Sequence, residues 1–359
     1  MTAEEKPPYV RLSAKNSARI RRVAFAFNMT EVREHKPTTL VDIAADGDVI
    51  LVVGPEKIRL RVHSLNLKAT SKPFSAMLGP IWKEGRDLLQ DGSVELPLPE
   101  DNAKAMEYIC ATLHHQNKML PVTMTPLDVL EVAVVADKYD LVDALRFASE
   151  SWLHARNAKA DELMVLTAAS YAFQNVQAFR DLTRTLILDY EGSYLSLATE
   201  RIESAMNWRV FCENPSIDSS GSCHGLLTVE LGLLEEQRNL ARLELGDVLI
   251  GGITSGGMCA HKCGWTSKYA YAYLKTLRDH HLWPTKLTNI SEAIDRAGSI
   301  PDPIPEERST PCTYEYKHTA PEYRKGRQRA IDYLRDHVGL CLHCARKENS
   351  TSAYCKRSH

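Results

Sequence analysis

The alternation of apolar and charged residues is clearest between residues 49 and 62. The run "VILVV" (49–53) is apolar throughout, whereas "IRLRV" (58–62) alternates apolar residues with two arginines. A period of two places the apolar side chains on one face of a strand, and the intervening "PEK" is typical of a turn. The pattern therefore predicts a β-hairpin, and "DGSVELPL" (91–98) predicts a further short strand after an Asp-Gly turn.

Helical periodicity dominates the rest of the chain. It predicts helices at residues 63–69, 72–78, 126–138 and 141–153, two more between 158 and 190, and a long amphipathic helix at 226–249. Another helix is expected after Asp101 and Asn102, because both residue types are good N-caps. The Ser/Gly-rich segment 214–225 and "GGITSGG" (251–257) predict loose connections.

The order of these elements indicates the fold class. Two or three strands come first and helices follow, which predicts an α+β domain over residues 40–154, with a small sheet capped by a helical cluster. We expect a flexible N-terminal arm at 1–39, because several prolines interrupt any regular element there. A mainly helical region should occupy 155–250, and a C-terminal Cys/His module should occupy 251–359.

Composition narrows the class of protein. Among 359 residues, 44% are hydrophobic and 25% are charged, and the formal net charge is −2, so total charge gives no reason to expect binding to nucleic acid or membranes. No segment is long and apolar enough to span a membrane, and the first residues do not form a signal peptide. Nine cysteines, an odd number, favour a reducing compartment, so we expect a cytoplasmic or nuclear protein.

His63 and Ser64 adjoin at the predicted strand-to-helix junction, where a reactive dyad is one interpretation. Neighbouring residues at the start of a helix point apart, and a Ser-His nucleophile also needs a third, orienting group. A structural histidine is the better hypothesis, with the ring bonded to backbone groups or to a nearby carboxylate such as Asp48. Without another catalytic constellation in the sequence, we expect a protein that is not an enzyme.

Four segments together resemble a BTB/POZ domain: "GDVILVVG", "RVHSLNLKATSKPFSAML", "VELPLPEDNAKAMEYICATLHH" and "VAVVADKYDLVDALRFASESWL". They cover roughly a third of the chain, and "LWP" (282–284) and "GLCLHC" (339–344) are similar to the tails of fungal BTB-containing proteins. The resemblance implies structural roles for Asp48 and His63. It also implies a homodimer formed through the first helix, which carries Leu65. The position after His63, often basic in transcription-factor members, is Ser64 here.

The segment "PIWKEGRD" (80–87) is the candidate partner-binding site. Cullin-binding BTB domains resemble one another here in an apolar-x-Glu element, which in this chain is Trp82-Lys83-Glu84. The resemblance therefore implies that Trp82 and Glu84 contact a cullin scaffold, as a substrate adaptor of a ubiquitin ligase would do. The alternative is that Trp82 packs on its own domain and Glu84 faces solvent.

Six of the nine cysteines lie after Met258, which makes the tail a candidate metal site. Thiolates spaced as C-x2-C can bind one tetrahedral zinc ion. The sequence predicts one structural zinc, with candidate ligands Cys259, His261, Cys263, Cys341 and Cys344, and with Cys312 as a substitute. The alternative is that these cysteines are reduced thiols that pack as small apolar groups.

These observations favour an intracellular protein that works by protein–protein association. Self-association is expected, and a ubiquitin-ligase adaptor that presents an unknown substrate or regulatory protein is the more specific hypothesis. The alternative is a nuclear or transcriptional regulator that contacts nucleic acid or chromatin partners through the tail. That tail is basic near "YRKGRQR" (323–329) and "CKRSH" (355–359), although it lacks any standard zinc-finger spacing.

Overall fold

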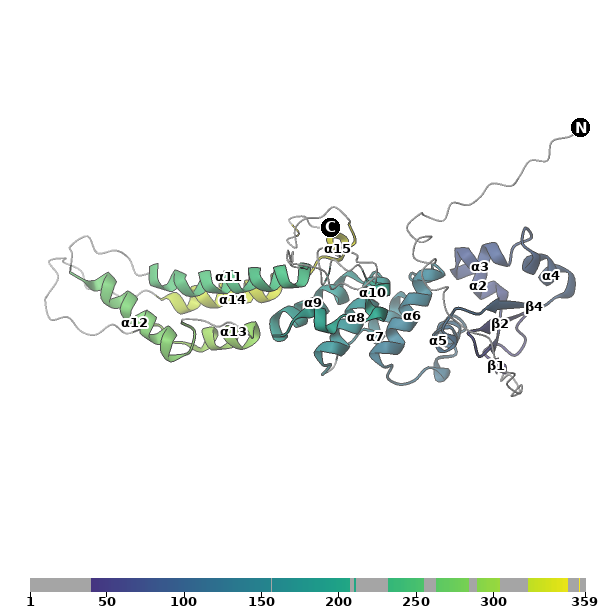
Figure 1. Ribbon diagram of the computed structural model, residues 1–359, viewed down its shortest axis with the longest axis horizontal. Coiled ribbons are helices and arrows are strands. Elements are labelled where there is room, and N and C mark those ends of the chain that lie inside the picture. The colour runs from purple at the N-terminus through teal and green to yellow at the C-terminus, as the bar shows by residue number, and fades with distance from the viewer. Residues whose placement is uncertain are drawn as a thin grey trace, which may run out of the picture. The chain divides into compact units, whose positions relative to one another are not determined.

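The computed structural model describes residues 40–359 except for 156, 207–209, 211–231, 255–262, 284–288, 304–321, 348–354 and 356–359. The described residues belong to one compact unit. The arm expected at 1–39 and the loose connection expected at 214–225 therefore lie outside the described residues. The described part has an α+β fold, with a small sheet near its beginning and helices after it (Figure 1), which confirms the predicted class.

The sheet has four strands in the order β1-β3-β2-β4. Strands β2 (Val49–Val53) and β3 (Ile58–Val62) form the predicted antiparallel hairpin, with Val49 opposite Val62. Strand β4 (Val94–Leu98), also predicted, pairs in parallel with β2. The sequence did not predict β1 (Leu40–Asp42), which pairs in parallel with β3.

The period-two pattern sets the two faces of this sheet. Leu60 and Val62 are fully buried, and every second residue of β2 is buried with them. The arginines that alternate with them remain partly exposed on the opposite face, where Arg59 pairs with Glu95 and Arg61 lies 3.2 Å from Asp42. One face of the hairpin therefore belongs to the apolar core, as the alternation predicted.

Strand β4 forms one edge of the sheet and contains a proline. The Val94 N–H donates to the Asp48 carbonyl oxygen at 3.0 Å, so the amides of every second residue from Val94 point toward β2. Pro97 occupies one of the alternate positions, where an N–H would point away from β2. A proline is tolerated in an edge strand at such a position because no hydrogen bond of the sheet is lost.

Six helices accompany the sheet, and local signals explain most of their ends. The side chains of Ser71, Asn102 and Thr125 each accept a hydrogen bond from a first-turn amide of α3, α5 and α6, respectively. The bounds of the six helices agree with the predictions, with two exceptions. Helix α7 begins five residues later than expected, and α4 was not predicted. The six are α2 (Ser64–Thr70), α3 (Lys72–Met77), α4 (Lys83–Asp91), α5 (Ala103–Leu113), α6 (Pro126–Lys138) and α7 (Arg146–Trp152), with a 3-10 turn, η1, at Asn117–Met119.

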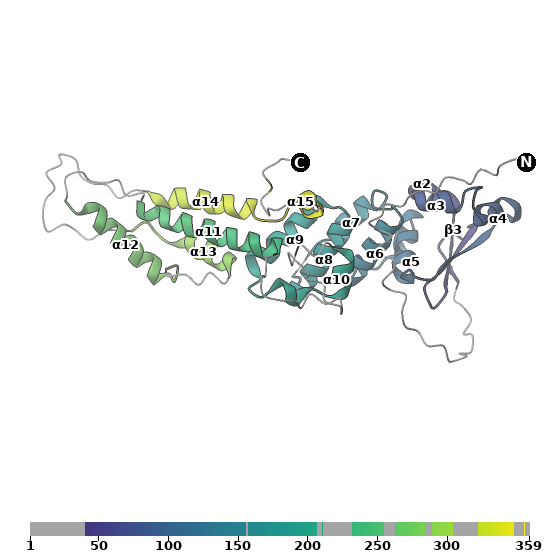
Figure 2. The same ribbon diagram turned by 45° about the horizontal axis from the view of Figure 1, so that its top comes forward.

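A second set of helices continues from the first without a break in the apolar core. Helix α6 packs on α8, α8 packs on α9, and α11 and α14 lie side by side (Figure 2). The elements of this set are α8 (Ala160–Ala172), α9 (Val176–Asp189), the 3-10 turn η2 (Tyr194–Leu197), α10 (Glu200–Ala205), α11 (Leu233–Thr254), α12 (Trp265–Asp279), α13 (Ile290–Ser299), α14 (Tyr323–His337) and α15 (Leu342–Arg346).

The expected loose connection at 251–257 is wrong for residues 251–254, which are the last turn of α11. A Cβ at Gly252 would overlap the ring of Tyr273, and one at Gly251 would crowd the hydroxyl of Tyr323. The two glycines therefore allow aromatic side chains from α12 and α14 to approach the backbone of α11, which explains their presence inside a helix. The domain boundary expected between 250 and 251 accordingly falls within one helix.

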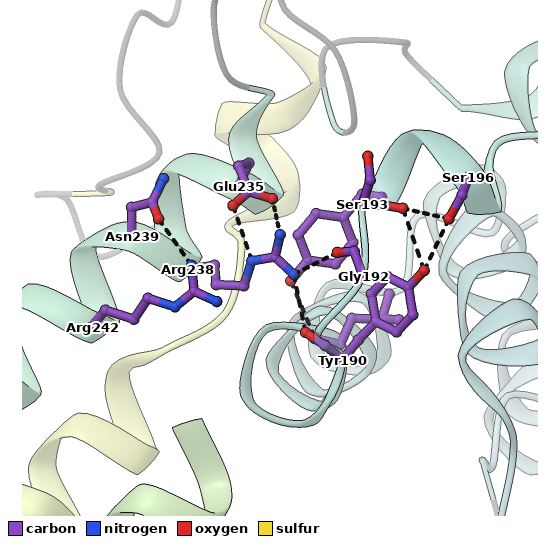
Figure 3. Close-up of polar contacts among 10 residues, drawn as sticks. Tyr190, Gly192, Ser193, Ser196, Glu235, Arg238, Asn239 and Arg242 are labelled. Atoms are coloured by element: carbon purple, nitrogen blue, oxygen red, sulfur yellow. Dashed lines mark hydrogen bonds and ion pairs between the residues drawn. The ribbon is translucent and has the colours of Figure 1, made fainter. Parts of the chain in front are cut away.

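A buried arginine joins α11 to the end of α9, and Figure 3 shows its surroundings. The side chain of Arg238 is ion-paired with Glu235 and donates to the carbonyl oxygens of Tyr190 (3.0 Å) and Gly192 (2.7 Å). Its guanidinium lies 4.4 Å from the centre of the Tyr194 ring. Carbonyl groups at and just after the end of a helix lack intrahelical partners, and Arg238 donates to two of them.

Candidate functional site

The corner between β3 and α2 is held by Asp48 and Ser64. The Ser64 N–H donates to Asp48 Oδ1 at 2.7 Å, and the Ser64 hydroxyl donates to Oδ2 at 2.6 Å. Burial raises the pKa of the Asp48 carboxyl, but these two hydrogen bonds and the nearby His63 outweigh it, so the net pKa is lowered. Asp48 therefore holds the first turn of α2 through Ser64.

The carboxylate nearest to the His63 ring is that of Asp46 and not that of Asp48, which was named as one example. Ser64 occupies both oxygens of Asp48, and the His63 Nε2 lies 3.2 Å from Asp46 instead. The His63 backbone N–H donates to His114 Nε2 at 3.0 Å, and the two rings are stacked with centroids 5.8 Å apart. Because the Ser64 hydroxyl donates to a carboxylate rather than to an imidazole, the geometry is that of a structural corner.

A neighbouring cluster, unforeseen from the sequence, joins the start of α5 to the end of α6. The Asp101 side chain is only 4% exposed, and it accepts hydrogen bonds from Lys138 Nζ and Tyr139 Oη, both at 2.6 Å. The Tyr139 carbonyl accepts from the Ser71 hydroxyl at 2.6 Å, and the Tyr139 ring stacks on Phe74. Burial raises the pKa of Tyr139, so its phenol remains a donor. The Lys138-Tyr139 pair thus connects three helices.

Of the three predicted partner-binding residues, Leu65 and Trp82 are exposed and Glu84 is partly buried. Leu65 on α2 is 72% exposed, and Trp82, the N-cap residue of α4, is 55% exposed. A Cβ at Gly85 would overlap the backbone of Gly79, so only glycine allows α4 to pack this closely on the turn that follows α3. This contact fixes the orientation of the first turn of α4, which presents Trp82.

Three cysteine side chains at the end of the chain lie together. The sulfur atoms of Cys341, Cys344 and Cys355 are all within 4.8 Å of one another, and the three residues are partly buried. Cys341 is the N-cap of α15, Cys344 lies in that helix, and Cys355 lies in the segment after it. Burial, with hydrogen bonds to the other two cysteines, raises the pKa of the Cys344 thiol to about 12. A cluster of this composition can hold a metal ion.

This cluster agrees only in part with the predicted ligand set. Cys341 and Cys344 lie together, as their spacing predicted. Cys263, a predicted ligand that belongs to the described residues, does not join them. Cys355, which was not a predicted ligand, is the third member of the cluster. Cys259, His261 and the substitute Cys312 lie outside the described residues.

The basic segment 323–329 is less available to a polyanion than its sequence suggests. Arg327 is fully buried, where its Nε donates to the Ala297 carbonyl oxygen at 2.9 Å and its Nη2 donates to the Ile300 carbonyl oxygen. The acceptors lie at the end of α13, whose negative dipole end favours a cation. Burial raises the pKa of Tyr273, which contacts Arg327 Nη1, to about 12 despite this positive charge.

No family model, curated protein or solved structure gives a significant match to this chain. The assignment to the BTB/POZ family therefore rests on the segments quoted above and stays a prediction. Of the helices in the described ranges, none is both long enough and apolar enough to cross a membrane.

Proposed function

We propose that this protein is an interaction protein built on a BTB/POZ-type domain at residues 40–154, and that it associates with itself through that domain. The observation that carries the proposal is the exposure of Leu65. This side chain is 72% exposed on α2, whereas Leu67, two residues further along the same helix, is fully buried. The BTB resemblance assigns this helix to the dimer interface, where a second copy would cover Leu65. Interfaces of this kind bury on the order of 2,000 Å² or more.

Light scattering of the full chain during size-exclusion chromatography tests self-association. At tens of micromolar, the unmodified protein should elute with the mass of two chains, and Leu65→Asp should elute as one. Leu243→Asp is the matched control, because Leu243 is also an exposed leucine (66%) on a helix but lies on α11. A monomeric unmodified protein would refute self-association. A dimer that persists in Leu65→Asp would refute the role of α2.

We further propose that the first turn of α4 contacts a cullin, which would make the protein a substrate adaptor in ubiquitin ligation. Trp82, more than half exposed, supports this proposal because exposed tryptophans are frequent hot spots of binding. Binding of the full chain to a purified cullin N-terminal domain should weaken about 30-fold in Trp82→Ala, which corresponds to about 2 kcal/mol. Glu84→Ala should weaken it about tenfold, whereas Glu56→Ala, in the exposed turn of the hairpin, should have no effect. Failure of the unmodified protein to bind any cullin would refute the adaptor role.

Zinc is the metal that we propose for the three-cysteine cluster, since thiolates are ligands that zinc prefers in closed structural sites. The alternative function, contact of the tail with nucleic acid, has less support because Arg327 is buried. A strongly salt-dependent affinity of the full chain for duplex DNA would restore that alternative.

A further inference from the structure

Two members of the three-cysteine cluster, Cys341 and Cys344, lie on a segment that packs on the helical region. The Leu340 N–H donates to the Thr183 hydroxyl of α9 at 3.0 Å, and Leu342 on α15 is 2% exposed. The Arg346 guanidinium lies 5.0 Å from the centre of the Tyr171 ring on α8. Cys341 and Cys344 are therefore held in place by packing and hydrogen bonds before any metal binds.

Cys355 differs from the other two because it belongs to no helix. It lies eleven positions after Cys344, beyond the polar sequence "ARKENSTSAY". Such a sequence offers little apolar surface to hold a chain end against the fold. The sulfur of Cys355 nevertheless lies within 4.8 Å of both Cys341 and Cys344, and its thiol is hydrogen-bonded to that of Cys344. The cluster thus includes a residue that lies outside α15 and beside it in space.

The chemistry of the cluster points to a thiophilic metal. Zn–S bonds of about 2.3 Å place the sulfurs of a tetrahedral site about 3.8 Å apart, which small side-chain rotations can reach from the present separations. A ligand set made of three thiolates selects zinc over calcium or magnesium, which take oxygen ligands.

We infer that Cys341, Cys344 and Cys355 bind one structural zinc ion that ties the end of the chain to α15 and, through it, to α9. Zinc takes four ligands, and among the described residues no fourth cysteine, histidine or carboxylate joins the cluster. A fourth donor outside this cluster, either a side chain or a water molecule, would complete the coordination. This inference is independent of the proposed self-association.

Elemental analysis of the full chain, purified without a metal-affinity tag, provides the first test. We expect one zinc per chain, and X-ray absorption at the zinc edge should show at least three sulfur neighbours. Cys355→Ser should lose the zinc, and Cys355→His should regain it, because imidazole is also a zinc ligand. Hydrogen exchange at the amides of 342–346 should accelerate at least tenfold in Cys355→Ser, since the metal also holds this helix.

Cys263→Ser is the matched control, because Cys263 is a partly exposed cysteine in the C-terminal region that does not belong to the cluster. This variant should retain one zinc per chain. Metal-free unmodified protein, or a disulfide within the cluster in freshly purified protein, would overturn the inference. Zinc that is lost in Cys263→Ser but kept in Cys355→Ser would overturn the ligand set, as would fewer than three sulfur neighbours in the absorption spectrum.

Discussion

Removal of one oxygen atom from Tyr139 tests the role of the buried Asp101 cluster. Tyr139→Phe removes the hydroxyl that donates to Asp101 at 2.6 Å. The ring can still stack on Phe74, because the two rings face one another with centroids 4.6 Å apart, and the Tyr139 carbonyl still accepts from Ser71. The change therefore affects one hydrogen bond and leaves the packing of the ring unaltered.

The expected cost follows from the burial of the carboxylate. The Asp101 side chain is 4% exposed, and among the described residues only Lys138 remains as a side-chain donor to it in the variant. A hydrogen bond to a charged group contributes about 1.5–3 kcal/mol, so we expect Tyr139→Phe to lower the free energy of unfolding by about 2 kcal/mol. Native-state hydrogen exchange measures this quantity for part of a chain, and amides of β2 and β3 should exchange about 30-fold faster.

Tyr271→Phe is the control for this measurement. Tyr271 is 70% exposed on α12, and loss of its hydroxyl should change the free energy of unfolding by no more than about 0.5 kcal/mol. If Tyr139→Phe has an effect as small as this control, the Asp101 cluster does not stabilise the fold, and the sequence Lys138-Tyr139 requires another explanation.

Two further predictions concern the residues around the candidate surfaces. Ser64→Ala should destabilise the protein by about 1 kcal/mol at pH 7. The folded-state pKa of Asp48 is lowered, so the stability that Asp48 contributes is present above its unfolded pKa of about 3.8 and is lost as the pH falls below that value. Unfolding curves of the variant and of the unmodified protein should therefore converge in that acidic range. Gly85→Ala should weaken cullin binding and lower the melting temperature, because the added Cβ overlaps the Gly79 backbone. Gly246→Ala is the control and should do neither, because a Cβ at Gly246 meets open space.

Local patterns allowed much of the fold to be predicted from the sequence. The alternation in 58–62 identified the hairpin and its buried face, and the N-cap Asn102 begins a helix where its residue type suggests. Strand β1 could not be predicted, because three residues carry no measurable period and their pairing with β3 is not local. The last turn of α11 was missed because its two glycines are explained only by tyrosines from other helices.

The candidate sites show the same limit. The C-x2-C spacing of Cys341 and Cys344 predicted that their sulfurs lie together. The spacing did not show that Cys355 rather than Cys263 joins them, because this depends on where the chain runs after α15. Arg327 lies in a basic run that is typical of a solvated surface, and its burial depends on carbonyl groups at the end of α13. The sequence of α14 alone therefore gives no indication that the Arg327 side chain points into the core.

The proline in β4 has a consequence for how copies of this protein can associate. An edge strand with a full row of outward-facing amides is a template for pairing with any extended chain, which is a common route to aggregation. At Pro97 that row lacks its N–H, so a strand added beside β4 would lose a hydrogen bond near the middle of the five-residue strand. Replacing Pro97 with valine would restore the row and should increase turbidity in concentrated solutions. The proline thus discourages association through this edge and leaves the helical surfaces for selective contacts.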